Sequence, residues 1–107
     1  TDCKQFRDFC YIDDLVSCIF KSLKSNINDG SIFNVGSGRS IKLIKIVEKV
    51  KKFTNKGEVN FSSVTKPKLY NKNLCADISK TKKCLKWSPV VSFDEGIKKT
   101  INWYKNN

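Results

Sequence analysis

The chain has 107 residues, of which 39% are hydrophobic and 11% aromatic, so we expect one domain with a modest core. No apolar run approaches the ~20 residues that a membrane-spanning helix needs, and the first residues do not resemble a signal peptide. The formal net charge of +11 suits a polyanionic partner or a phosphorylated ligand. Because the sequence contains no Met, we expect a piece excised from a longer protein.

Cysteine and histidine usage limits the kinds of site. The five cysteines are odd in number, irregularly spaced and include no C-x-x-C pair, so a zinc site or a disulfide framework is a poor interpretation. Without any His, a Ser-His-Asp triad is impossible. We expect reduced, mostly buried thiols in a cytoplasmic protein.

The basic charge leaves a stand-alone nucleic-acid-binding module as the alternative from another functional class. A helix expected over residues 41–54 would present one basic face, formed by Lys42, Lys45, Lys49 and Lys52. However, 19 of the 21 basic residues are Lys, and base readout favours the forked guanidinium of Arg, which only Arg7 and Arg39 provide. We therefore expect weak, salt-sensitive attraction to nucleic acid without sequence preference.

The first predicted elements are an extended segment and a helix. Residues 6–12 are rich in strand formers. Asp13 or Asp14 is then expected to cap an amphipathic helix, which ends in the polar run at residues 25–30.

The next predicted elements flank a glycine turn. Residues 31–35 are expected to form a short buried strand, and Ser40 to cap the helix over 41–54. The intervening Gly36-Ser37-Gly38 could be a phosphate-binding loop or a tight turn. A dinucleotide fingerprint needs a third Gly where this sequence has Ile41, so we favour the turn.

The last third contains two predicted strands and two predicted helices. Residues 59–61 and 74–76 are expected to be short strands, and Asp77 to cap a short helix ending near Leu85. Ser92-Phe93-Asp94-Glu95 has the pattern of a capping box at the start of a final helix. The resulting order predicts an α/β fold.

Arg7 is the strongest candidate for a ligand-binding residue, because it lies in an apolar stretch of a chain that otherwise uses Lys. It could form an ion pair with Asp8 or Asp13, or it could bind a phosphate through its guanidinium fork. Residue patterns alone leave both interpretations open.

Five segments resemble motifs of the extended short-chain dehydrogenases/reductases, the NAD-dependent epimerase/dehydratase family that acts on nucleotide sugars. The motifs are R-D-F-x-Y-V-x-D-L, Y-N-V-G-S-G, A-D-x-S-K, L-G-W-x-P and S-L-E-E-G-I…W-Y. Their counterparts here are residues 7–15, 32–38, 76–80, 85–89 and 92–104, with Lys86 in place of the usual Gly. The five matches keep the family's order and spacing, which makes them more specific together than any one alone.

The resemblance implies that residues 1–107 are a C-terminal substrate-binding domain, a small lobe of short strands with about four helices, without the Rossmann domain. In this family the Rossmann domain holds NAD(P) and a catalytic Tyr-x-x-x-Lys pair. Here Tyr11 and Tyr70 have Leu four residues later, and Tyr104 lies too near the end. The isolated chain is thus expected to bind no cofactor and to be inactive.

The resemblance also describes the parent enzyme. It would be a cytoplasmic, NAD(P)-dependent homodimer that modifies a nucleotide-linked hexose for surface polysaccharide. Epimerisation, 4,6-dehydration and 4-keto reduction stay open, because the residues that distinguish them would lie upstream. A vestigial domain with only a packing role is a further alternative.

The resemblance assigns roles to three basic residues. The Arg that corresponds to Arg7 contacts the ligand's diphosphate in the family. Thr65-Lys66-Pro67 is similar to the T-K-P of fucose-synthase-type epimerase/reductases, although the usual Gly after it is missing. Lys66 and Lys72 are therefore candidate phosphate or ribose contacts, with ordinary solvated lysines as the alternative.

Overall fold

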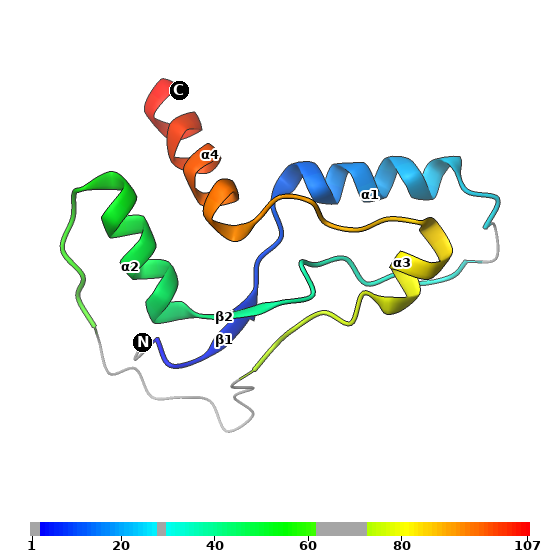
Figure 1. The fold of residues 1–107 in the computed structure, drawn as a ribbon, viewed down its shortest axis with the longest axis horizontal. Helices are drawn as coiled ribbons and strands as arrows, with labels where there is room; N and C mark the ends of the chain where they lie inside the picture. Colours follow the sequence, from blue (N-terminus) through cyan, green and yellow to red (C-terminus); the bar gives the residue numbers. More distant parts are fainter. Residues whose placement is uncertain (1–2, 28–29, 62–72) are drawn as a thin grey trace.

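The computed structural model describes residues 3–27, 30–61 and 73–107, and Figure 1 labels its helices and strands. In chain order they are β1 (Phe6–Asp8), α1 (Ile12–Lys24), β2 (Ser40–Lys42), α2 (Leu43–Thr54), α3 (Ser79–Leu85) and α4 (Phe93–Asn106). Helices α1 and α3 occupy one end of the molecule and α2 and α4 the other, with the two-stranded sheet between them (Figure 1). The predicted α/β class is confirmed.

The sheet consists of β1 and β2, paired antiparallel with Arg7 opposite Ile41 and Asp8 opposite Ser40. An isolated parallel bridge joins Phe6 to Asn73 on the other side of β1. Since side chains alternate along a strand, Arg7 points to one face of the sheet and Asp8 to the other. The predicted cap at Ser40 is wrong, because this residue begins β2 and the helix follows directly after the strand.

The core lies between α1 and α3 and is centred on Trp87, which is 1% exposed. Cys18 of α1 and Ile78 and Leu85 of the α3 segment complete the buried cluster. The indole Nε1–H of Trp87 donates to the backbone oxygen of Asp14 at 3.2 Å and to Ser17 Oγ at 2.8 Å. This polar end of the ring finds partners on α1, so the indole is buried without an unpaired donor.

Three predicted strands are not strands in the structure. Residues 31–35 run alongside α3, and their carbonyl groups bind side chains of that helix instead of a neighbouring strand. Thr81 Oγ1 donates to the oxygen of Asn34 at 2.6 Å, and Lys80 Nζ donates to that of Ile32 at 3.0 Å. Residues 59–61 and 74–76 also carry no strand, apart from the bridge at neighbouring Asn73.

The helix starts follow the predictions in part. No aspartate caps α1, which begins at Ile12 after Tyr11; the carboxylate of Asp14 instead accepts the backbone N–H groups of Val90 and Val91, each at 3.0 Å. The expected cap of α4 is confirmed, because Ser92 Oγ accepts the N–H of Glu95 at 3.3 Å.

The molecule is flat and open for its length. Its extents are 49 × 41 × 19 Å and its radius of gyration is 16.6 Å, whereas a compact chain of this size would measure ~13 Å. Helix α1 exposes an apolar stripe made of Ile12, Val16, Ile19, Phe20 and Leu23. Within the described ranges, each helix is too short or too polar to cross a membrane.

Candidate functional site

The carboxylate of Asp8 joins three segments that lie far apart in the sequence. Its Oδ1 accepts the backbone N–H of Ser37 at 2.8 Å and the Ser37 hydroxyl, and its Oδ2 accepts the N–H groups of Gly38 at 3.0 Å and Ala76 at 3.1 Å. Burial raises the pKa of Asp8, but these hydrogen bonds outweigh it and lower the pKa below the ordinary value of 3.8. An ionised Asp8 therefore holds β1, the Gly36-Ser37-Gly38 turn and the backbone at Ala76 together.

This arrangement decides between the two interpretations of the Gly36-Ser37-Gly38 segment. A phosphate loop needs backbone N–H groups that face the ligand, but here the amides of Ser37 and Gly38 face a carboxylate. Gly36 is also packed tightly, since a Cβ there would lie 2.6 Å from Ala76 Cβ and 2.7 Å from Asp8 Oδ2. The segment is a structural turn, and a dinucleotide diphosphate does not fit it.

Arg7 lies in the middle of β1, and its Nη1 donates to the backbone oxygen of Phe6 at 2.6 Å. That bond holds the guanidinium close to the strand. The carboxylate of Asp8 lies on the opposite face of the sheet and accepts backbone N–H groups there. Asp8 therefore has a structural role that is separate from that of Arg7. The other two predicted site residues, Lys66 and Lys72, lie outside the described residues.

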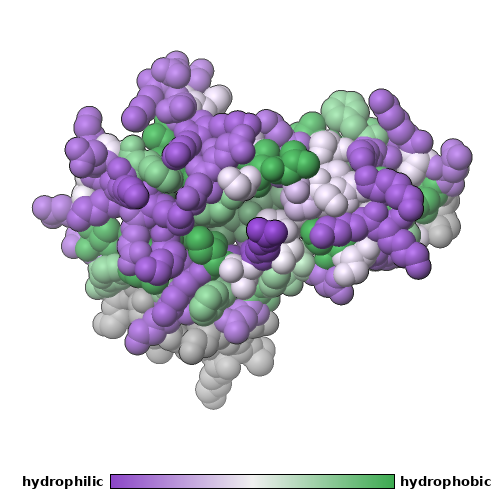
Figure 2. Space-filling view, viewed as in Figure 1, coloured by the Kyte–Doolittle hydropathy of each residue, from purple (hydrophilic) through white to green (hydrophobic). Residues whose placement is uncertain are grey.

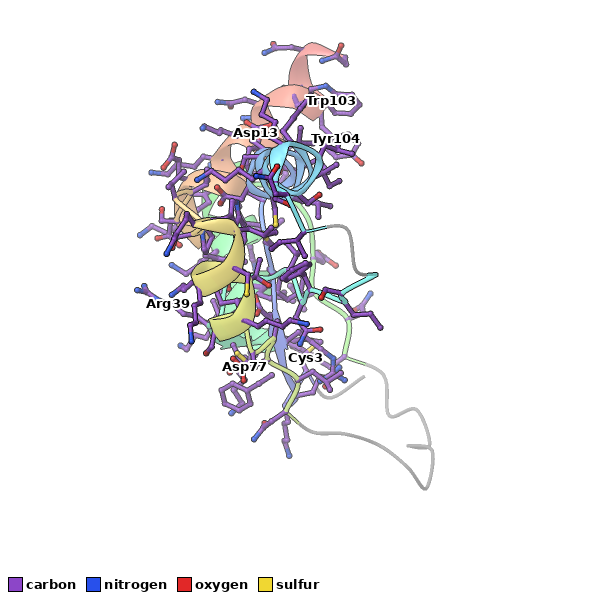
Figure 3. The ribbon with its side chains drawn as sticks, turned by 90° about the vertical axis from the view of Figure 1, so that its right-hand side faces the viewer. Cys3, Asp13, Arg39, Asp77, Trp103 and Tyr104 are labelled. Carbon is purple, nitrogen blue, oxygen red and sulfur yellow. The ribbon has the colours of Figure 1, made fainter. Side chains whose placement is uncertain are left out.

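A cleft of about 690 Å³ lies between the glycine turn, the start of α3 and the connector to α4. Figure 2, which has the same view as Figure 1, shows a hollow near the middle of the molecule, where hydrophobic and strongly hydrophilic residues meet. Arg39 and Lys82 contribute positive charge to its lining, and Asp77 contributes a carboxylate. In the side view of Figure 3, Arg39 and Asp77 lie on the side of the molecule that carries α3.

Sequence reasoning missed this cleft, because its walls come from residues 37–41, 76–82 and 88–93. The scarcity of Arg was a usable signal, since Arg39 is the only Arg besides Arg7. Nothing in the local sequence around Lys82 distinguishes it from the other lysines.

Known proteins resemble the chain over nearly all of its length. The sequence model of the family described as GDP-mannose 4,6 dehydratase matches residues 1–100. A UDP-glucuronate 4-epimerase of Thermodesulfobacterium geofontis is 38% identical over 107 residues, which covers 99% of this chain and 32% of the relative. A CDP-abequose synthase of Salmonella muenchen is 36% identical over 104 residues, covering 95% of this chain and 35% of the relative.

Solved structures agree with the sequence relatives. The UDP-glucuronic acid 4-epimerase of Bacillus cereus, in complex with UDP-glucuronic acid and NAD, has a TM-score of 0.85 and 29% identity. The match covers 98% of this chain and 33% of the epimerase chain. The chain spans about a third of the length of the curated relatives it matches. The resemblance drawn from the five motifs is thus confirmed, and the chain belongs to the GDP-mannose 4,6 dehydratase family of extended short-chain dehydrogenases/reductases.

Proposed function

We propose that residues 1–107 are the C-terminal, nucleotide-sugar-binding domain of a cytoplasmic, homodimeric, NAD(P)-dependent epimerase, dehydratase or reductase. The observation that carries the proposal is the likeness of 98% of the chain to one third of an epimerase solved with UDP-glucuronic acid and NAD. The sequence relatives include an epimerase and a 4,6-dehydratase. None of these matches supports the alternative of a nucleic-acid-binding module.

The open shape of the molecule supports a partner domain in the same parent enzyme. The apolar stripe of α1 includes Leu23, which is 75% exposed, and Phe20, which is 57% exposed. A contiguous apolar helix face of this kind is normally covered in a soluble protein. An upstream Rossmann domain of the same parent would cover it and would account for the remaining two thirds of the relatives' length.

The residues of this chain are suited to binding the substrate and not to hydride transfer. NAD(P), when bound in the parent, supplies hydride transfer at the sugar. This chain has no Tyr-x-x-x-Lys pair, and its glycine turn is closed by Asp8. Its own contribution is to bind and orient the substrate, with Arg7 on the diphosphate and Lys66 and Lys72 on phosphate or ribose. A guanidinium fork fixes a diphosphate in one orientation better than a mobile ammonium does.

The isolated chain is expected to show no turnover. Purified residues 1–107 are incubated with UDP-glucuronic acid, UDP-glucose or GDP-mannose and with NAD or NADP, and products are followed by mass spectrometry. We expect no product because the chain lacks the Tyr-x-x-x-Lys pair and because the carboxylate of Asp8 already binds the amides of the glycine turn. Turnover that scales with protein concentration and survives further purification would contradict the assignment of this chain to binding alone.

Binding of a nucleotide diphosphate by the full-length enzyme is expected to depend on Arg7 more than on any single Lys. Losing a charge-assisted, forked contact costs about 1.5–3 kcal/mol, so Arg7→Ala should weaken UDP or GDP binding by roughly 10- to 150-fold. Lys66→Ala should cost less, because a mobile ammonium is a weaker anchor. Isothermal titration calorimetry measures both.

Two variants make this titration interpretable. Arg7→Lys keeps the charge but loses the fork, so affinity should stay well below that of the wild type. Lys105→Ala removes an exposed charge from the last turn of α4 and should leave binding unchanged. A larger loss for Lys66→Ala than for Arg7→Ala would overturn the role of Arg7.

A further inference from the structure

We propose that the cleft beside α3 is a second ligand site and that it takes a phosphorylated sugar. In this assignment Arg39 and Lys82 hold the phosphate, and Asp77 accepts hydrogen bonds from the sugar hydroxyls. The site goes beyond the proposed nucleotide-sugar binding by Arg7, which does not line the cleft.

Two cations, Arg39 and Lys82, line the cleft together with one carboxylate, that of Asp77. Among the described residues Lys45, Lys49 and Lys99 form ion pairs, whereas neither Arg39 nor Lys82 forms one. They come from different segments, the residue after the glycine turn and α3, and both line one cleft because Asp8 binds the backbone of Gly38 and of Ala76. Two cations in a concave site attract an anion more strongly than the same charges on a convex surface.

The carboxylate of Asp77 explains why a sugar fits better than phosphate alone. Hydrogen bonds from the Ser79 hydroxyl and backbone N–H lower the pKa of Asp77, so it is an ionised acceptor at neutral pH. Its two oxygens offer about four acceptor positions, of which the Ser79 hydroxyl and the Ser79 N–H, at 3.0 Å from Oδ1, use two. An ionised carboxylate in the cleft repels a bare anion. It can, however, accept hydrogen bonds from a ligand that carries hydroxyl groups next to its phosphate.

The size and the walls of the cleft agree with this ligand class. A volume of about 690 Å³ lies within the range of roughly 300–1,000 Å³ typical of small-molecule sites. Phe9 and Phe93, whose ring centroids lie 6.0 Å apart in an edge-to-face contact, form an apolar wall for the C–H face of a sugar ring. Ser40 and Ser88 also line the cleft and carry hydroxyls that can donate or accept.

The test is calorimetric titration of the 107-residue chain with glucose 1-phosphate, glucose and inorganic phosphate at ~150 mM salt, where surface charge is largely screened. Glucose 1-phosphate should bind one to one, inorganic phosphate at least about tenfold more weakly, and glucose without measurable heat. Arg39→Ala and Lys82→Ala should each weaken glucose 1-phosphate binding about tenfold or more. Lys105→Ala, at an exposed residue of α4 that does not line the cleft, should leave it unchanged.

Asp77→Asn distinguishes sugar recognition from simple charge attraction. The amide oxygen can still accept the Ser79 N–H, so the turn is retained. This variant should bind glucose 1-phosphate several-fold more weakly and inorganic phosphate more tightly. The proposal is overturned if Asp77→Asn tightens both ligands, if phosphate matches glucose 1-phosphate, or if Arg39 and Lys82 variants bind like the wild type. Circular dichroism of each variant confirms that the comparison is between folded chains.

Discussion

Replacing Trp87 with Ala is expected to lower the free energy of unfolding of this chain by about 3–5 kcal/mol. Trp87 is 1% exposed and stands at the centre of the buried cluster between α1 and α3. The substitution opens a cavity there and removes the indole donor that binds the oxygen of Asp14 and Ser17 Oγ. Since a domain of this size is stable by only about 5–15 kcal/mol, the loss would be a large part of the total.

The other tryptophan of the chain supplies a matched control. Trp103 is 59% exposed on α4 and contacts Tyr104 edge-on, with ring centroids 5.0 Å apart. Trp103→Ala should therefore cost less than about 1 kcal/mol. Urea unfolding followed by circular dichroism compares the two, and Trp103→Phe leaves Trp87 as the only indole for fluorescence. Equal losses for Trp87→Ala and Trp103→Ala would show that Trp87 is not the centre of the fold.

Trp87→Phe separates the polar contribution of the indole from its volume. Phe retains most of the apolar packing but leaves the oxygen of Asp14 and the hydroxyl of Ser17 without the indole donor. We expect a loss of about 1–3 kcal/mol, smaller than that of Trp87→Ala. A loss as large as for Ala would indicate that the hydrogen bonds, rather than packing, dominate at this position.

Local sequence signals placed the helices well, because their causes are local. The Ser92 cap fixes the start of α4, and Asn55, with φ of 52°, ends α2 directly after residue 54, where the predicted helix also ends. The strands were predicted less well. Whether residues 31–35 pair as a strand depends on a neighbouring strand, and here their carbonyl groups meet Lys80 and Thr81 of α3 instead.

The roles of Asp8 and Asp14 could not be predicted for the same reason. Sequence adjacency left open an ion pair of Arg7 with Asp8 or Asp13, and a cap of the first helix by Asp13 or Asp14. The structure gives Asp8 partners 29, 30 and 68 residues away, and gives Asp14 partners 76 and 77 residues away. Family resemblance identified the segments that contain both residues, but only tertiary structure shows that these motifs bind one another. The cleft beside α3 is another product of that assembly.

Replacing Asp8 with Ala is expected to cost about 2–4 kcal/mol at neutral pH, because the backbone N–H groups of Ser37, Gly38 and Ala76 lose a charged acceptor together. The pKa of Asp8 is lowered in the folded chain from the ordinary 3.8. Its stabilisation is therefore fully present above pH 3.8 and is lost as the pH falls through the lower pKa of the folded state.

Asp8→Asn tests the charge and its pH dependence directly. The amide keeps one acceptor oxygen, so this variant should lose less stability than Asp8→Ala at pH 7. The stability gap between wild type and Asp8→Asn should narrow as the pH falls through the lowered pKa of Asp8, because the wild-type carboxyl then becomes neutral. Urea unfolding at a series of pH values measures the gap, with Asp13→Asn, an exposed carboxylate on α1, as the control that should change little. A gap that stays constant over this pH range would mean that the ionised carboxylate of Asp8 does not hold the glycine turn.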